Sequence, residues 1–494
     1  MHNVTARVGD PDGSALSGTL ALMESVGTTP RVVRRGPFLA LSALTALVIG
    51  ALGLMISEGA TGATATALVE ATPWLFFAAV AAPALLAIAA RPQRGILLLV
   101  ALVPFNGLLL VVPGRPPFIE GWKEALAIFT LAWALMSAYN KGRVRERPMF
   151  AGPVVAYLGL GLVSAVVVAV MTSPIQAAIG LKVGYFWLIA AVAAWLAPLD
   201  ERDRDRVVSL LMAAGLLTSI YGIAQQSIGH ETLNAWGYEY NQNIRFTGAY
   251  LRSISTFPTP FNFAFFLTLV LLVGIPVALD DLKRPRNQLF LATMPIVLLA
   301  LGFTFVRGAW LALGVGLVVL AVRRYRALLI PAPFALLGLL ALPGTFSASA
   351  FQGESFNDRT VGWGSNLTKL LDAPFGRGIG TTGASAEKLL EVQGSINLEQ
   401  LYQPDNQYFK AIYEIGVPGL FLYLFVLVSI VVTLIGAERR MARPDRAFAI
   451  GVSANVVGAM VASLVATWLE IFPNEFFLWL LATIAFTAAR PESA

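Results

Sequence analysis

Residues 346–414 read FSASAFQGESFNDRTVGWGSNLTKLLDAPFGRGIGTTGASAEKLLEVQGSINLEQLYQPDNQYFKAIYE and form the one long polar interruption in an otherwise hydrophobic chain. Interruptions of this length usually carry function or are disordered. Here, apolar residues at helical spacing over 363–371, a glycine turn at 376–380 and an amphipathic run over 387–392 indicate order. The sequence therefore predicts a folded cap on a membrane, with a further helix opening near Asp405.

The remainder of the chain has the composition of a polytopic membrane protein. Its 494 residues are 57% hydrophobic and 13% charged, which excludes an ordinary soluble fold. The excess of basic residues is scattered through short loops and does not form the basic face that nucleic-acid binding requires. Without cysteine, the chain has no disulfides or thiolate metal sites.

We predict an all-α fold with about fourteen transmembrane helices, within a range of about 12–14, because apolar runs of spanning length recur along the chain. The candidate spans are 38–57, 71–90, 95–112, 122–139, 152–171, 175–197, 207–229, 259–279, 288–304, 307–322, 327–345, 413–437, 447–468 and 474–489.

Lysine and arginine alternate between successive loops when these boundaries are used, which predicts cytoplasmic termini on both ends. The expected organisation is a cytoplasmic tail over 1–37, spans 1–11 over 38–345, an extracytoplasmic cap over 346–412, and spans 12–14 with a short cytoplasmic tail over 413–494. The cap is thus a large, partly helical loop on the outer face between spans 11 and 12.

Ten basic residues remain on the outer side, where orientation does not explain them, and five of these are arginines gathered around three outer loops. The five arginines are Arg245, Arg252, Arg307, Arg359 and Arg377. Arg307 lies in a short turn between two apolar runs, where a charge is costly. The planar guanidinium forms paired hydrogen bonds to phosphate, so an anionic ligand presented from the lipid, such as a lipid-linked diphosphate, is predicted. The alternative is that long outer loops simply carry some charge.

Four stretches resemble motifs of the O-antigen ligase and O-antigen polymerase superfamily of bacterial integral membrane glycosyltransferases. Ser255 stands where the family usually has glycine, and Asp405 stands where its ligases typically have histidine. The four stretches are LRSISTFPTPFNFAFFL from Leu251, TFVRGAWLAL from Thr304, NDRTVGWGSNLTKLLDAPFGRGIG from Asn357 and PDNQYFKAIYEIGVPGLFLYL from Pro404.

The resemblance implies location in a bacterial inner membrane and a metal-independent, inverting transfer at its outer face, with no cofactor. A glycan would leave undecaprenyl diphosphate and join a sugar hydroxyl, so the expected partners are a lipid-linked glycan donor, a glycan acceptor and the bilayer. Aspartate at position 405 favours a polymerase of O-antigen or exopolysaccharide over a ligase, and both alternatives stay open.

The chemistry needs stabilisation of the departing diphosphate and a proton acceptor. Arg252 and Arg307 are the candidates for the first role, because preorganised donors aimed at developing charge are often the largest catalytic term. Asp405 is the candidate base. Its alternative role is that of a helix N-cap after Pro404.

Further candidates for substrate binding are Arg245 beside these arginines, Arg359, Arg377 and Asn406 in the cap, and Lys182 with Tyr185 inside the sixth span. Lys182 is too deep to snorkel, so it should have a buried partner or an anion. Glu470, in contrast, is expected to pair with one of the arginines.

A lipid-linked oligosaccharide flippase or an ion-coupled transporter is the alternative from another class. Such proteins usually carry intramembrane charges along a path. Here the charges gather toward one face, which favours the enzyme.

Overall fold

The computed structural model describes residues 82–111, 120–141, 146–240, 243–330, 373–393, 405–470 and 472–489. The chain divides into two compact units, residues 1–86 and 87–494, and the helices and strands named here belong to the second. The predicted span 38–57, most of 327–345 and much of 71–90 lie outside the described residues, as do Arg359 and the predicted helix over 363–371.

Helix dominates the described residues, as the apolar runs predict. Six helices are long and apolar enough to cross a membrane, or seven if one bent pair is a single span. The total of about fourteen spans stays a prediction. The six are α6 (Ala151–Met171), α9 (Glu201–Ile228), α11 (Pro260–Asp280), α12 (Pro285–Phe303), α18 (Gln407–Ala437, with the turn to Arg440) and α19 (Arg443–Ala462).

The other helical elements are shorter or less apolar. They are α4 (Gln93–Leu102), η1 (Val103–Val111), α5 (Trp122–Lys141), α7 (Pro174–Tyr185), α8 (Leu188–Leu196), α10 (His230–Ala235), α13 (Arg307–Arg323), η3 (Arg326–Leu329), α17 (Gly383–Gln393), η5 (Glu438–Arg440), η6 (Trp468–Glu470) and α20 (Asn474–Thr487).

Two predicted spans contain breaks that their apolar composition does not reveal. The run over 175–197 forms α7 and α8, which meet at an angle of 51°. Helix α18 begins at Gln407 rather than at 413, and Gly416 interrupts it with φ 73° and ψ −175°. Glycine tolerates this backbone conformation because it has no Cβ. Both breaks border one cavity, which Tyr185 and Ile415 help to line.

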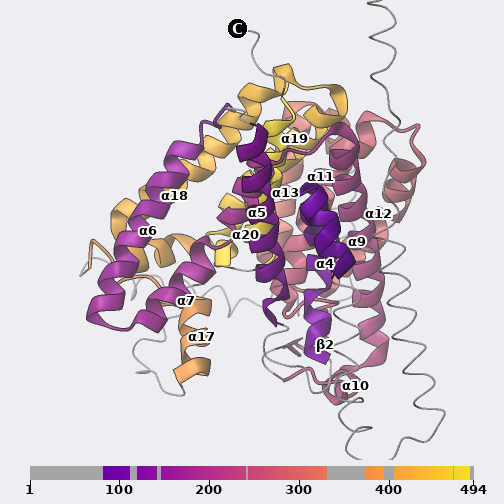
Figure 1. Ribbon diagram of the computed structural model, residues 1–494. Coiled ribbons are helices and arrows are strands. Elements are labelled where there is room, and N and C mark those ends of the chain that lie inside the picture. The colour runs from indigo at the N-terminus through magenta and orange to yellow at the C-terminus, as the bar shows by residue number, and fades with distance from the viewer. Residues whose placement is uncertain are drawn as a thin grey trace, which may run out of the picture. The chain divides into compact units, whose positions relative to one another are not determined.

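Helix α19 runs through the centre of the unit, where it packs against α11 and α13 (Figure 1). Two glycines allow the backbones to approach closely: a Cβ at Gly451 would lie 2.6 Å from the Leu272 carbonyl oxygen, and one at Gly458 would lie 2.6 Å from that of Ala312. Small residues at helix crossings serve this purpose in membrane proteins. Helix α11 is accordingly buried over 94% of its apolar window.

A second group consists of α6, α7 and α18, with α17 packed against α7 (Figure 1). Helix α20 joins this group to the centre through contacts with α18, α19 and α8. The all-α expectation has one small exception, an antiparallel hairpin of β1 (Phe246–Thr247) and β2 (Tyr250–Leu251) that pairs Phe246 with Leu251.

Replacing Gly458 by alanine should destabilise the protein, because the new Cβ would meet the Ala312 carbonyl in the packed crossing of α19 and α13. Overpacking of this kind costs about 1 to 3 kcal/mol. Gly314→Ala is the matched control, since that glycine of α13 has no atom within 4 Å of an added Cβ. The thermal midpoint of the purified protein should fall for Gly458→Ala alone. Equal midpoints would contradict close backbone packing here.

Candidate functional site

Two of the predicted arginines converge on the ring of Phe261, in the first turn of α11. The guanidinium carbon of Arg252 lies 5.0 Å from the ring centroid and that of Arg245 lies 6.0 Å away. The hairpin brings them together, because its strands are antiparallel and the Arg252 amide donates to the Arg245 carbonyl at 2.9 Å. Cations over aromatic faces are held by the ring quadrupole, so both guanidinium groups are oriented on one support.

Arg252 also ties this loop to the turn that precedes Arg307. Its Nε donates to the carbonyl of Thr304 at 3.0 Å, and Arg307 is the first residue of α13. Phe305 in the turn has φ 52°, a left-handed conformation that is uncommon outside glycine, and its ring stacks on Tyr250 with centroids 5.8 Å apart. The structure therefore brings Arg245, Arg252 and Arg307, at the start of α13, into one region. We call these three residues the arginine group.

Ser255 explains why a glycine is usual at this position of the motif. Its φ is 54°, which lies in the region that glycine adopts without strain. Hydrogen bonds hold the serine there: Gln225 Oε1 accepts from its amide at 2.7 Å, and its Oγ donates to the Thr218 carbonyl at 2.6 Å. Glycine would adopt this backbone conformation without strain. Serine adopts it with the help of hydrogen bonds to α9.

The loop between α10 and the hairpin has its own small core. Tyr238 is fully buried with Leu233, Ile244, Leu251 and Ile254. Burial, with a smaller effect of Tyr221, raises the pKa of the Tyr238 hydroxyl. This tyrosine therefore supports the loop that carries Arg245.

The glycine turn of the cap docks against the break in α18. Gly376, Gly378 and Gly380 all have positive φ, at 82°, 102° and 76°. The Arg377 amide donates to the Tyr413 carbonyl at 2.7 Å, and the Gly378 amide to the Glu414 carbonyl at 2.9 Å. Carbonyls near the break thus find partners that a continuous helix would have supplied.

Arg377 has different contacts from the residues of the arginine group. Its side chain is exposed, and its guanidinium carbon lies 5.1 Å from the ring centroid of Tyr413.

The position at which α18 begins bears on the second role predicted for Asp405, that of a helix N-cap. The N-cap is Asn406, whose Oδ1 accepts from the amides of Tyr408 at 2.9 Å and Phe409 at 3.2 Å. Asn406 is buried, whereas Asp405 is exposed. The prediction that Asp405 caps the helix is wrong because the helix begins at Gln407, so the cap falls on the following residue. The carboxylate of Asp405 is thus outside the cap.

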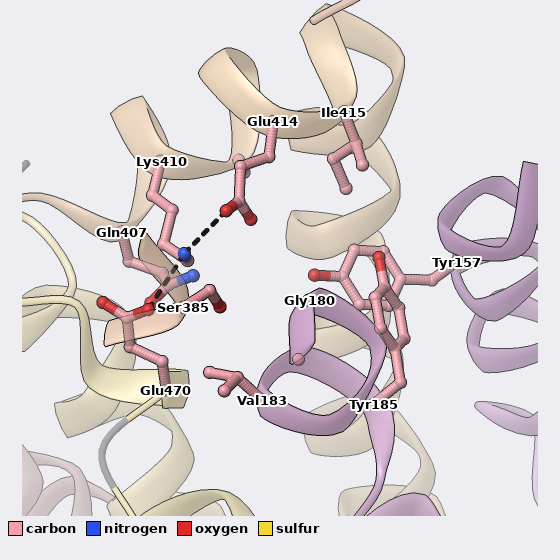
Figure 2. A pocket seen from close by; sticks show the side chains of 12 residues that line it. Tyr157, Gly180, Val183, Tyr185, Ser385, Gln407, Lys410, Glu414, Ile415 and Glu470 are labelled. Carbon is pink, nitrogen blue, oxygen red and sulfur yellow. Dashed lines mark hydrogen bonds and ion pairs between the residues drawn. The ribbon is translucent and has the colours of Figure 1, made fainter. Parts of the chain in front are cut away.

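A buried lysine holds this end of α18 to two other elements (Figure 2). Lys410 Nζ lies 3.0 Å from Glu414 Oε1 and 2.9 Å from Glu470 Oε2. It also donates to the carbonyl of Thr382 at 3.2 Å. Only 5% of Lys410 is exposed. Glu470 was expected to pair with an arginine, and the structure corrects this partner to Lys410.

Glu414 is further bonded to the cap. Its Oε1 accepts from the Gly380 amide at 3.2 Å and from the Thr382 hydroxyl at 3.1 Å. The three ionisable groups carry one positive and two negative charges when all are ionised, so one negative charge is balanced by hydrogen bonds alone. We call Lys410, Glu414 and Glu470 the buried triad. Its sequence signal is the spacing of Lys410 and Glu414, since residues i and i+4 face each other on a helix.

The buried triad borders a cavity of about 30 Å³. Figure 2 shows Tyr157 and Tyr185 on one side of it and Gln407 with Ser385 on the other. A cavity must exceed roughly 10 to 15 Å³ to hold one water, so this space suits ordered water rather than a sugar. Its chemical capacity is therefore to relay a proton or to hold polar groups in place.

Lys182 and Tyr185, predicted as one extension of the site, have different neighbours. Tyr185 packs on Tyr157 with centroids 5.1 Å apart and faces the cavity. Lys182 instead pairs with Glu124 of α5, with 3.1 Å between Nζ and Oε1. Glu124, which the sequence did not single out, is the partner that a cation in this span requires.

No group of three or more His, Asp or Glu side chains in the part of the chain that the structure describes is placed to hold an ion.

Comparison with known proteins bears on the same region. Residues 292–424 match the O-antigen ligase family model. The match confirms the resemblance, and it contains Arg307, the glycine turn, Asp405 and two members of the buried triad. The stretch from Leu251, with Arg252, precedes it. No curated protein gives a significant match.

Lys410→Met should destabilise the protein strongly, because it leaves Glu414 and Glu470 buried without a cation. Breaking a buried ion pair costs about 3 to 5 kcal/mol. Lys283→Met is the matched control, because that lysine is exposed on the loop before α12. Thermal unfolding measures the difference. The triple variant that adds Glu414→Gln and Glu470→Gln should recover much of the loss; if it does not, packing rather than charge explains the effect.

Proposed function

We propose that this protein is a glycosyltransferase of the outer face of the bacterial cytoplasmic membrane. It would transfer or polymerise glycan from an undecaprenyl-diphosphate-linked donor onto a sugar hydroxyl. The observation that carries this proposal is the arginine group, assembled from two segments far apart in sequence and adjoining the region that matches the O-antigen ligase family. Its guanidinium groups suit a diphosphate.

In the proposed step, the acceptor oxygen forms a bond to the anomeric carbon of the donor as the bond from that carbon to the diphosphate oxygen breaks. The departing diphosphate takes the electron pair, and Arg252 and Arg307 stabilise its charge without a metal. Attack from the opposite face inverts the anomeric carbon. Arg245 assists through its shared support on Phe261, and the proton of the acceptor hydroxyl passes to Asp405.

Asp405 is proposed as the base because it is an exposed carboxylate at a rigid position. The next residue, Asn406, caps α18, and the Gln407 amide donates to the Ser463 carbonyl at 2.8 Å. The backbone beside Asp405 is thus tied to α19 while its side chain stays accessible. In this proposal Arg377 and Arg359 bind more distant parts of the substrate, while Asn406 and Tyr185 act by positioning.

We propose a polymerase rather than a ligase because position 405 is an aspartate. A flippase is less well supported, because the long helices α6 and α11 carry no charge between their ends. Charges along a transport path would be expected there.

The test is the product formed by the purified full-length protein from a lipid-linked oligosaccharide. A ladder of products indicates a polymerase, and a single addition to a second acceptor indicates a ligase. Both should persist in EDTA. Movement of intact donor across vesicles without any new glycosidic bond would instead establish the flippase, and strict restoration by magnesium would refute the metal-independent step.

Arg252→Lys and Arg307→Lys should each nearly abolish transfer, although lysine keeps the positive charge. Lysine is a point donor and lacks the planar fork that makes paired contacts to a diphosphate. The rate should fall about 10²- to 10³-fold, as when one oxyanion donor is removed. Arg286→Lys, in the first turn of α12, is the control for an arginine whose contacts are to Asp205, Ser209 and Asn287. Near-normal rates for Arg252→Lys and Arg307→Lys would reduce these residues to structural charges.

Asp405→Asn should remove transfer and leave the fold intact, because Asn406 supplies the cap. The rate should fall at least ~10²-fold if the carboxylate takes the proton. Asn406→Ala is the converse control, expected to lower stability by about 1 kcal/mol through loss of the cap. Asp405→His should retain some activity with a raised pH optimum, since histidine titrates near 6.5. A wild-type rate for Asp405→Asn would mean that another group accepts the proton.

A further inference from the structure

We propose that Lys123, Lys182 and Lys388 form a second anion-binding subsite around Glu124. This lysine subsite binds the phosphoryl group of the acceptor glycolipid. This lysine subsite rests on the proposed function, because only a transfer between two lipid-linked molecules brings a second phosphoryl group to the protein. It adds a binding site for the acceptor beside the arginine group that would hold the donor.

The lysines come from three elements, of which α17 packs against α7, and two of the lysines share one carboxylate. Lys182 of α7 lies 3.1 Å from Glu124, and Lys123 at the start of α5 lies 3.4 Å from it. The titratable groups whose charges act on Lys123 are Glu124, Lys182 and Lys388 of α17. Three ammonium groups thus accompany one carboxylate, which leaves an excess of positive charge at this point.

Burial makes this excess costly without an anion. The side chains of Lys123 and Glu124 are each only 14% exposed, whereas that of Lys182 is 52% exposed. Like charges repel more strongly where water is partly excluded. An incoming phosphoryl group would relieve the repulsion, and it would be met by the half-exposed Lys182 and the exposed Lys388 while Lys123 stays paired with Glu124.

Phe472 links the lysine subsite to the start of α11, beside the arginine group. Lys123 Nζ lies 5.3 Å from the centroid of the Phe472 ring, and the carbonyl of Phe472 accepts from Asn262 Nδ2. Asn262 follows Phe261, whose ring supports Arg245 and Arg252. Phe472 and the start of α11 thus connect the two groups of cations, which suits a donor and an acceptor that each carry phosphate.

The two groups also differ in a way that suits their roles. Arginine makes paired, directional bonds and suits a diphosphate whose charge grows during the reaction. Lysine is a compact charge on a flexible stem. The acceptor's phosphoryl group does not react, so it needs attraction rather than fixed geometry.

The test is binding of a fluorescent prenyl diphosphate to the full-length protein in nanodiscs of phosphatidylcholine. We expect two sites per chain. Lys182→Met with Lys388→Met should weaken one of them about tenfold or more, the typical effect of losing a hydrogen bond to a charged group. Lys123 still pairs with Glu124 in this double variant, which preserves the fold. Arg252→Lys should weaken only the other site, and Lys283→Met should change neither.

Turnover gives a second measurement. The double lysine variant should raise the KM for the acceptor and leave kcat and the KM for the donor little changed. Nanodiscs containing phosphatidylglycerol distinguish the sources of phosphate: if this lipid displaces the probe from the lysine subsite, the ligand is an ambient lipid and the acceptor role is overturned. A single site that only Arg252→Lys weakens would refute the lysine subsite and leave the proposed function standing, whereas no binding at all would refute both.

Discussion

The contacts of Lys410 are the constraint on which the arrangement of this region depends. A single ammonium group joins Glu414 in α18, Glu470 in η6 and Thr382 before α17. Because a buried charge is stable only with partners in good geometry, these elements cannot separate without exposing an unpaired ion. The start of α18, with Asn406 and Asp405, is therefore fixed relative to α19 and to the described part of the cap.

The breaks in α18 and between α7 and α8 lie beside the elements that Lys410 holds together. Gly416 interrupts α18, and the glycine turn fills the gap with amide donors to the Tyr413 and Glu414 carbonyls. Helices α7 and α8 also meet at a bend, and residues of α7 line the cavity beside the buried triad. In a membrane, non-helical backbone is tolerated where it is buried in protein or lines a polar cavity. The irregular backbone is thus concentrated where the polar groups are.

Charge is sorted around these breaks by sign. The buried triad has an excess of carboxylate, whereas the arginine group and the cluster around Glu124 have an excess of cation. Helices α6 and α11 are uncharged between their ends. The carboxylates of the buried triad border the cavity that Tyr157 and Tyr185 also line (Figure 2).

The sequence by itself determined the membrane character, most boundaries of α6, α11, α12 and α13, the glycine turn and the family resemblance. Each depends on residues close together in the chain: hydrophobicity summed over a span, or the freedom of glycine at positive φ. Only the tertiary structure decided that Asn406 rather than Asp405 is the cap, that Glu470 pairs with Lys410, and that Glu124 pairs with Lys182. The reason is that a buried charge is satisfied by whichever segment packs against it, and residues as distant in sequence as Lys182 and Glu124 carry no local signal of that packing.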